Sequence, residues 1–243
     1  MDMTSPVRTN QPVSDPPLRL TQVNHAPASY ADEGQGPILL LIHGLPGSIR
    51  DWRYLVPQLA GVRTIRVDLP GFGATSRRDK SHWSVDQRAM WLIDFLDAIG
   101  VDEVVVAGHS MGAAIAIAMA AISPERVRRL ALISSPGLYP HEMFVRGKMP
   151  GVSSMLRWRL FRWAVGPALR RGLIGAGFSS HLTIAEALAA VADAGLLDFQ
   201  VHRQRVEALQ HPTVVAWSQD DQWIDESLSQ QLADACPAGP RLS

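Results

Sequence analysis

Short apolar runs alternate with longer amphipathic stretches over most of the 243-residue chain. The short runs are nearly continuous in Val, Ile and Leu, as is typical of parallel strands that are buried on both faces. This alternation predicts an α/β fold, in which a mostly parallel sheet carries crossover helices on both faces. The candidate strands are Ile38–Ile42, Val62–Asp68, Val104–Ala107, Leu130–Ser134 and Thr213–Trp217, with Leu18–Val23 and Ser29–Asp32 as candidate edge strands.

Two helices are predicted from the residues at their ends. Ser84 and Gln87 have the spacing of a capping box, which starts a helix that Gly100 ends. An Ala-rich helix follows from Ser110 to Ile122, and the Ser-Pro pair after it stops it.

The stretch from 140 to 210 breaks the alternation, because it has helix-like apolar spacing and no clear strand. We interpret it as a helical lid inserted between two core strands. A basic, aromatic first half of this kind can lie on an anionic membrane surface. The alternative, which we favour, is a lid helix with one solvated face and its aromatic side chains directed into a pocket. The residues concerned are Arg146, Lys148, Arg157, Arg159, Arg162, Arg170 and Arg171, interleaved with Trp158, Phe161 and Trp163.

These patterns divide the chain into four parts. Residues 1–17 are polar and Pro-rich, which predicts a flexible extension, and residues 18–139 form the first part of the core domain. Residues 140–210 form the lid insertion, and residues 211–243 form a second core part that we expect to be incomplete.

Composition excludes several classes of function. Lys and Arg together number 23, as do Asp and Glu, so no overall basic field favours nucleic acid as a partner. The longest apolar run, Ala113–Ile122, is too short for stable insertion into a membrane. Cys236 is the only cysteine, which excludes an intrachain disulfide or a cysteine metal cluster and fits a cytoplasmic protein. The sequence does not indicate an oligomeric state.

The strongest chemical signal is the segment VVVAGHSMGA at residues 104–113. An apolar strand there runs into Gly-x-Ser-x-Gly, and a helix follows. The turn between them is sharp, so the residues around Ser110 must be small, and Gly108 and Gly112 satisfy that need. Such a turn exposes the Ser110 hydroxyl at the N-terminus of a helix, where the helix dipole favours a developing negative charge.

Three further motifs accompany this turn in order along the chain: HGLPGS at 43–48, DLPGFGATS at 68–76 and WSQDD at 217–221. Together with the Ser110 turn they resemble the α/β-hydrolase superfamily, in particular its lidded esterase, lipase, C–C hydrolase and perhydrolase-like members. The resemblance spans roughly Ile38 to Ala235. It implies the α/β-hydrolase fold, and it implies no metal and no organic cofactor.

The resemblance also implies roles for individual residues. Leu45 and Met111 would donate backbone N–H groups to an oxyanion, and Ser110 would be the nucleophile. His43 and Gly44 would shape the loop before Leu45 rather than act as a base. His109 would point away from the nucleophile, by the geometry of the turn.

The acid of the triad is implied at Asp221, which follows the strand Thr213–Trp217. Ser218 replaces the usual Gly of this motif and Asp220 is adjacent, so Asp220 stays an alternative to Asp221. The base normally follows the last core strand in this fold, but the chain has no His after Asp221. We therefore expect the chain to be truncated before its final strand, final helix and catalytic His. His181 and His202, in the lid stretch, are the candidates to replace that His.

A Ser nucleophile implies an acyl-enzyme, so we expect hydrolysis of a small ester or related acyl substrate. Related epoxide hydrolases and haloalkane dehalogenases carry Asp at this position instead. The competing hypotheses are a protein that binds a small apolar ligand without catalysis, and a truncated product that does not fold stably.

Overall fold

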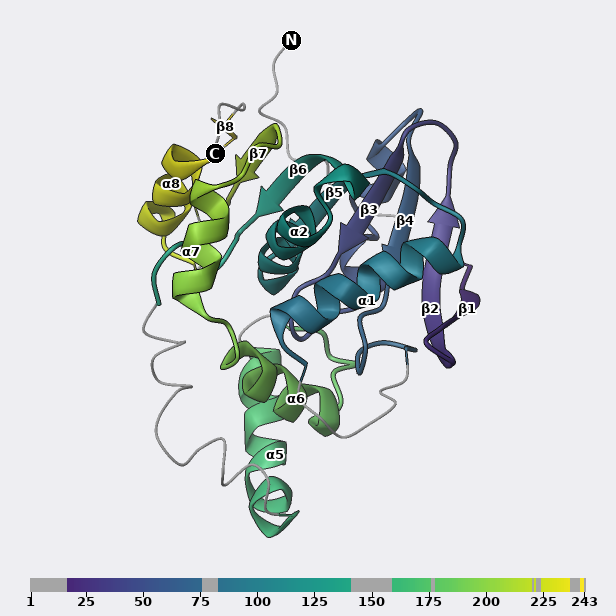
Figure 1. Ribbon diagram of the computed structural model, residues 1–243. Helices are drawn as coiled ribbons and strands as arrows, with labels where there is room; N and C mark the ends of the chain where they lie inside the picture. The colour runs from purple at the N-terminus through teal and green to yellow at the C-terminus, as the bar shows by residue number, and fades with distance from the viewer. Residues whose placement is uncertain are drawn as a thin grey trace.

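A computed structural model describes residues 17–75, 83–140, 159–175, 178–219, 221, 224–236 and 241–242. Its centre is an eight-stranded sheet with the strand order β1-β2-β4-β3-β5-β6-β7-β8 (Figure 1). The predicted extension at residues 1–17 lies almost entirely outside the described residues. The strands are β1 (Arg19–Val23), β2 (Ala26–Glu33), β3 (Ile38–Ile42), β4 (Arg63–Val67), β5 (Val104–His109), β6 (Val127–Ile133), β7 (Thr213–Ala216) and β8 (Arg241–Leu242).

The sheet is mostly parallel, as the apolar runs predict. β1 pairs antiparallel with β2, and β2 pairs antiparallel with β4, whereas every pairing from β4 to β8 is parallel. A two-residue strand lies at the edge of the sheet, where the sequence analysis expects the final core strand to begin. Arg241 and Leu242 form the two-residue strand β8, which pairs with Val215 and Ala216 of β7.

The helices cover the two faces of the sheet unequally. One face packs against four α-helices and contains the larger apolar core, in which Leu40 and Val106 are fully buried. The other face packs against two short 3₁₀ helices, where Trp52 contacts Leu41. The four α-helices are α1 (Val85–Ala98), α2 (Met111–Ile122), α7 (Phe199–Glu207) and α8 (Glu226–Ala235), and the 3₁₀ helices are η1 (Ile49–Trp52) and η2 (Val56–Gln58), with η3 (Pro124–Arg126) before β6.

The predicted capping box starts α1. The Gln87 N–H donates to the Ser84 hydroxyl at 3.2 Å, and the Ser84 N–H donates to the Gln87 side-chain oxygen at 2.8 Å. Each side chain thereby satisfies a backbone donor that the first turn of a helix leaves unused. Gly100 follows the helix with a φ of 67°, a conformation that glycine adopts without steric cost.

Helices α5 (Arg159–Gly175) and α6 (Ile184–Ala194) pack together beyond one end of the sheet (Figure 1). We call this pair the cap. It lies in the stretch between β6 and β7 that the sequence interprets as an insertion. The third helix of that stretch, α7, packs instead on α2, and its Phe199 and Val206 belong to the main core. Among the described residues, no helix is long and apolar enough to cross a bilayer.

Candidate active site

Ser110 stands at the sharp turn between β5 and α2. Its φ of 52° and ψ of −122° are rare for a residue with a side chain. The Ser110 N–H donates to the Ile133 carbonyl of β6 at 2.8 Å, which ties the turn to the neighbouring strand. A Cβ on Gly108 would lie 2.3 Å from the Gly112 carbonyl oxygen, and a Cβ on Gly112 would lie 2.3 Å from the Ile42 carbonyl oxygen. Both glycines are therefore required by the backbone, for the steric reason that the sequence predicts.

The loop that follows β3 passes directly over this turn. A Cβ on Gly44 would lie 3.2 Å from both His109 Nδ1 and Ser110 Cβ, so the absence of a side chain allows the close approach. This approach brings Leu45 to the wall of the cavity that Ser110 also lines. Met111 lines the same wall as the first residue of α2, where backbone N–H groups are not used within the helix. The structure thus brings the two predicted oxyanion donors, Leu45 and Met111, to the side of Ser110.

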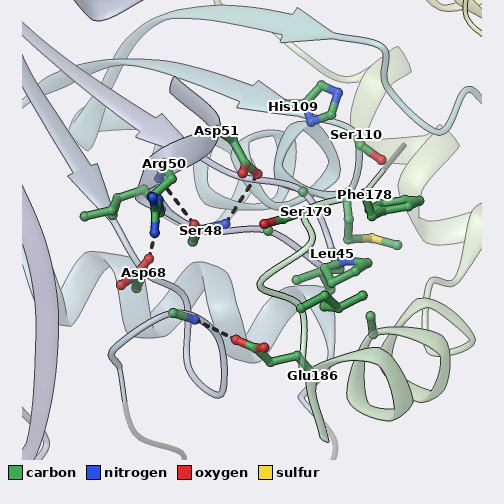
Figure 2. A pocket seen from close by; sticks show the side chains of 18 of the residues that line it. Leu45, Ser48, Arg50, Asp51, Asp68, His109, Ser110, Phe178, Ser179 and Glu186 are labelled. Atoms are coloured by element: carbon green, nitrogen blue, oxygen red, sulfur yellow. Dashed lines mark hydrogen bonds between the residues drawn. The ribbon is translucent and has the colours of Figure 1, made fainter. Parts of the chain in front are cut away.

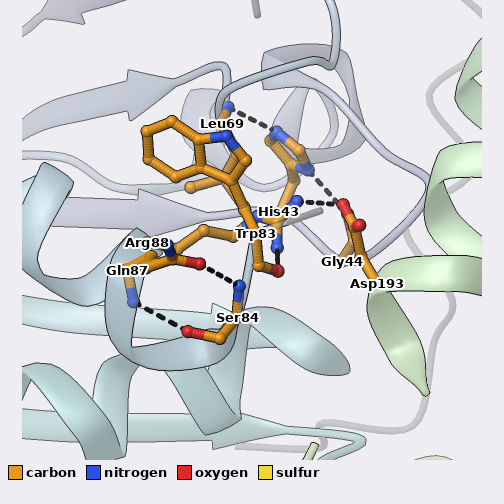
Figure 3. A network of polar contacts seen from close by, with 8 residues as sticks. All are labelled: His43, Gly44, Leu69, Trp83, Ser84, Gln87, Arg88 and Asp193. Carbon is orange, nitrogen blue, oxygen red and sulfur yellow. Dashed lines mark hydrogen bonds and ion pairs between the residues drawn. The ribbon is translucent and has the colours of Figure 1, made fainter. Parts of the chain in front are cut away.

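His43 shapes this loop from below and is fully buried. Its Nε2 lies 3.0 Å from the Leu69 N–H, which can only donate, so Nε2 is the acceptor and the ring proton is on Nδ1 (Figure 3). Nδ1 then donates to the Gly44 carbonyl at 2.6 Å. Burial lowers the pKa of His43, which keeps the ring neutral. With both nitrogens occupied and no exposed surface, His43 is placed to hold the loop and not to exchange protons with a ligand.

A buried carboxylate joins this loop to the one after β4. Asp68 accepts from the Ile49 N–H at 2.9 Å and from the Ala74 N–H at 2.8 Å. Burial raises the pKa of Asp68, and these donors oppose that shift. The neighbouring Gly73 N–H donates to Glu186 of α6 at 3.2 Å, so the same loop also contacts the cap (Figure 2). The sequence places Asp68 in a motif, but no sequence signal pairs Gly73 with a residue 113 positions away.

Asp221 lies on the loop after β7 and lines the cavity together with Ser110. Its carboxylate accepts from the Ile224 N–H at 3.0 Å, and its own N–H donates to the Ser218 carbonyl at 3.1 Å. These two bonds orient the predicted triad acid. The alternative, Asp220, lies outside the described residues.

The histidines near the site differ in their access to it. His109 and His181 both line the cavity, although the Ser110 hydroxyl is directed away from the His109 ring (Figure 2). Burial lowers the pKa of His109, and the charge of Asp221 opposes this shift. His202 is 2% exposed within α7, outside the cavity lining. Of the two sequence-based candidates for the base, the structure therefore places His181 in the cavity and His202 outside it.

The cavity has a volume of about 1050 Å³, which is large enough for a drug-sized molecule. Its walls come from the loops after β3, β5 and β7 on one side and from the cap on the other. Most of its lining is apolar, with Trp52, Leu173 and Phe178 as examples. Among the described residues, no group of His, Cys, Asp and Glu side chains has the arrangement of a metal site. The arrangement therefore offers the Ser110 hydroxyl, nearby N–H donors and the Asp221 carboxylate to a mainly apolar ligand.

The model of the family described as "alpha/beta hydrolase fold" matches residues 37–190, which is more than half of the chain. The chain belongs to this family. The match includes the loop after β3, the Ser110 turn and most of the cap. The resemblance that the motifs carry is thereby confirmed at the level of the superfamily.

Several of the similar proteins are named as hydrolases. Bifunctional epoxide hydrolase 2 of Mus musculus is 33% identical over 114 residues, which are 46% of this chain and 21% of the mouse protein. A 2-hydroxy-6-oxo-2,4-heptadienoate hydrolase of Pseudomonas putida is 38% identical over 111 residues, which are 44% of this chain and 40% of that protein. The chain thus matches less than half of the length of either relative. The solved enol-lactonase of Burkholderia xenovorans superposes with a TM-score of 0.70 over 92% of this chain and 90% of that one, at 19% identity, which shows the shared fold.

Proposed function

We propose that this protein is a serine hydrolase that cleaves a small, partly apolar ester through an acyl-enzyme on Ser110. The observation that carries the proposal is the position of Ser110. It combines a strained turn, the N-terminus of α2 and the wall of a mainly apolar cavity. A serine held in this way has its hydroxyl exposed to a ligand and its helix dipole directed at the reacting oxygen.

In the proposed reaction, Ser110 Oγ attacks the acyl carbon and its proton passes to a base. The carbonyl oxygen becomes an oxyanion, to which the N–H groups of Leu45 and Met111 donate. Two donors in place before the reaction are worth several kcal/mol in the transition state. Expulsion of the alcohol leaves an ester on Ser110, and water then hydrolyses it by the reverse sequence of proton transfers.

The nucleophile distinguishes the proposed reaction from epoxide hydrolysis, the activity for which one of the relatives is named. The epoxide hydrolase relative is similar over 46% of this chain, whereas attack by a serine on an acyl carbon suits esters, thioesters and activated carbon–carbon bonds. The Pseudomonas putida relative, named as a hydrolase of 2-hydroxy-6-oxo-2,4-heptadienoate, is consistent with the last of these classes. Among the described residues, the cavity wall offers the His181 imidazole as a base and Asp221 as a carboxylate, whereas the Ser110 hydroxyl is directed away from the His109 ring.

The test is covalent labelling with a fluorophosphonate together with turnover of p-nitrophenyl butyrate. We expect the probe to label the parent chain, and we expect Ser110→Ala to lose both labelling and turnover, the latter by on the order of 10³-fold or more. Ser179→Ala is the matched control, because Ser179 lines the same cavity but lies far from the turn in sequence. His109→Ala and His181→Ala would then show which imidazole takes the proton.

A second candidate function is binding without catalysis. The observation in its favour is that no imidazole within the described part of the chain hydrogen-bonds to Ser110. A serine without a base reacts slowly, so a chain that unfolds cooperatively and binds the butyrate ester saturably, but is not labelled, would replace the catalytic proposal with this one.

A further inference from the structure

The outward side of α5 is apolar and open to solvent. Trp163 is 81% exposed, which is the largest exposure among the large hydrophobic side chains that the structure describes. Ala164, Pro167 and Ala168 are also exposed, and they recur with Trp163 at the spacing of one side of a helix. The preferred sequence interpretation, that the aromatic residues of this stretch point into the pocket, is therefore wrong for Trp163. Trp158 and the side chain of Phe161 lie outside the described residues.

The exposed side of α5 continues onto α6 as a shallow apolar groove. Trp163, Ala164 and Pro167 form one wall of the groove, and Ile184 and Leu188 form the other. The two helices are in close contact, because a Cβ on Gly166 would lie 2.4 Å from Ile184 Cγ2. The apolar surface therefore rests on two packed helices.

The charge of α5 is entirely positive. Its sequence, RLFRWAVGPALRRGLIG, has four arginines and no acidic residue, in a chain whose formal charge is zero. Arg171 is exposed two turns after Trp163 on the same side of the helix. Arg170 instead holds the cap together, since its guanidinium donates to the carbonyls of Leu182 at 2.5 Å and Ser180 at 3.0 Å.

The position of α5 makes this surface accessible. The helix projects from the molecule at the end opposite to β8, and its far side has no neighbouring helix or strand among the described residues (Figure 1). A flat partner could reach α5 without contacting the sheet or the layer of α1, α2 and α7. The exposed apolar side of α5 and Arg171 thus lie at a tip of the described part of the molecule.

We infer that the outward face of the cap, formed by Trp163, Ala164, Pro167, Arg171 and Ile184, binds the surface of an anionic lipid bilayer. An exposed Trp beside Arg suits the membrane interface, where the indole enters the headgroup region and the guanidinium meets lipid phosphates. Positive charge favours an anionic partner, and the apolar groove favours a lipid over a nucleic acid, because the groove would stay in water against a polyphosphate backbone. In this arrangement the cap rests on the surface of the bilayer, and no part of α5 spans it. This inference does not depend on the chemistry of Ser110.

The experiment is co-sedimentation of the full chain with vesicles of phosphatidylcholine, with and without about 30% phosphatidylglycerol, at low and high salt. We expect binding to the anionic vesicles at about 0.05 M salt and much weaker binding at about 1 M, where charges are screened within ~3 Å. Trp163→Ser and Arg171→Glu should each weaken binding by about tenfold, because one removes the inserted indole and the other reverses a charge.

Two matched controls lie far from the cap. Leu20→Ser removes an apolar side chain that is 70% exposed on β1, and Arg128→Glu reverses an arginine that is 63% exposed on β6. Both should bind like the parent. A second readout is tryptophan fluorescence in the presence of brominated lipid. The lipid should quench the emission of Trp163, and Trp163→Ser should lose this quenched component.

Three results would overturn the inference: no sedimentation with anionic vesicles, equal loss in the controls, or binding that survives both cap variants. A concentration-dependent dimer that Trp163→Ser abolishes, without vesicle binding, would assign the face to a second copy of the chain instead. Labelling of Ser110 by fluorophosphonate in the same samples reports separately on the proposed hydrolase activity.

Discussion

At the scale of single residues, His202 is a buried imidazole whose environment disfavours its charged form. It is 2% exposed, its ring donates to the Gly137 carbonyl, and its Nε2 has no partner among the described residues. Burial, helped by the positive charge of Arg205, lowers its pKa to about 4. The folded chain therefore holds His202 neutral across a range in which an unfolded chain would protonate it.

This difference predicts a loss of stability in mild acid. The unfolded His202 takes up a proton as the pH falls through about 6.5, whereas the folded one does so only near pH 4. The free energy of unfolding should thus be highest above pH 7 and should lose about 3 kcal/mol from this group as the pH falls to 4. Urea unfolding of the parent and of His202→Leu between about pH 4 and pH 7 measures this loss of stability. The variant should show a flatter pH dependence, whereas His25→Asn, at an exposed turn, should retain the slope of the parent.

At the scale of elements, one ion pair joins the core to the cap. Arg88 of α1 donates to Asp193 of α6 at 2.5 Å, and the two side chains are 1% and 0% exposed (Figure 3). The Arg88 guanidinium also donates to the Trp83 carbonyl and lies 5.8 Å from the centre of the Phe72 ring. Two elements separated by 105 residues in sequence are therefore joined through a pair of charges that water does not reach.

Because this pair is buried, we predict that the stability costs of substituting its two residues are not additive. Arg88→Met or Asp193→Leu alone leaves an unpaired buried charge and should cost about 3–5 kcal/mol of stability. The double variant places two apolar groups in contact and should cost far less than the sum of the single changes. Chemical denaturation of the four chains gives the coupling energy. Two costs that simply add would show that the charges act independently, and the exposed pair Arg128–Glu103 provides a control cycle with coupling below about 1 kcal/mol.

At the scale of the whole molecule, the core and the cap each supply one wall of the cavity. Residues of α6, among them Val191 and Ala194, face the Ser110 turn across about 1050 Å³. We therefore expect the cap to determine the size of the acyl group in the proposed reaction and the core to determine the chemistry. A substitution on α6 should therefore change the preference for acyl size without changing the chemistry at Ser110.

We predict that Val191→Trp narrows the cavity and shortens the preferred acyl chain. The rate for p-nitrophenyl octanoate should fall about tenfold relative to that for p-nitrophenyl acetate, because the indole occupies space that a long acyl chain needs. Hydrolysis of both esters by the parent and the variant measures this ratio. Val201→Trp, on α7 outside the cavity lining, should leave the ratio unchanged. Equal losses for both esters would place Val191 outside the acyl site.

The parts that the sequence predicts well are those governed by local rules. Ile38–Ile42 is predicted residue for residue as β3, because a strand buried on both faces is a continuous apolar run. The capping box at Ser84 and the steric need for Gly108 and Gly112 depend on neighbours within a few residues. For the same reason, the ten residues from 104 to 113 are enough to recognise the Ser110 turn.

The parts that the sequence does not predict depend on contacts distant in the chain. Nothing near Asp193 indicates that it lies against Arg88, and nothing near Trp163 distinguishes an outward from an inward indole. The turn at Ser110 gives the backbone position of His109 but not the cavity that the cap forms around it. Such features follow from how elements pack, which a periodicity of apolar residues leaves open.

The cap is inserted between β6 and β7, which are neighbouring parallel strands, and this placement has a consequence for how the chain can change its length. About 80 residues leave the sheet after Ile133 and return at Thr213, which pairs with Leu130 three residues before that point. The entropy of closing such a loop grows only with the logarithm of its length, so doubling it costs about 0.6 kcal/mol. A single residue inserted within β5 would instead move the side chains on one side of the insertion to the opposite face of the sheet. Insertions and deletions are therefore tolerated where the acyl group would be selected and excluded where the serine is held.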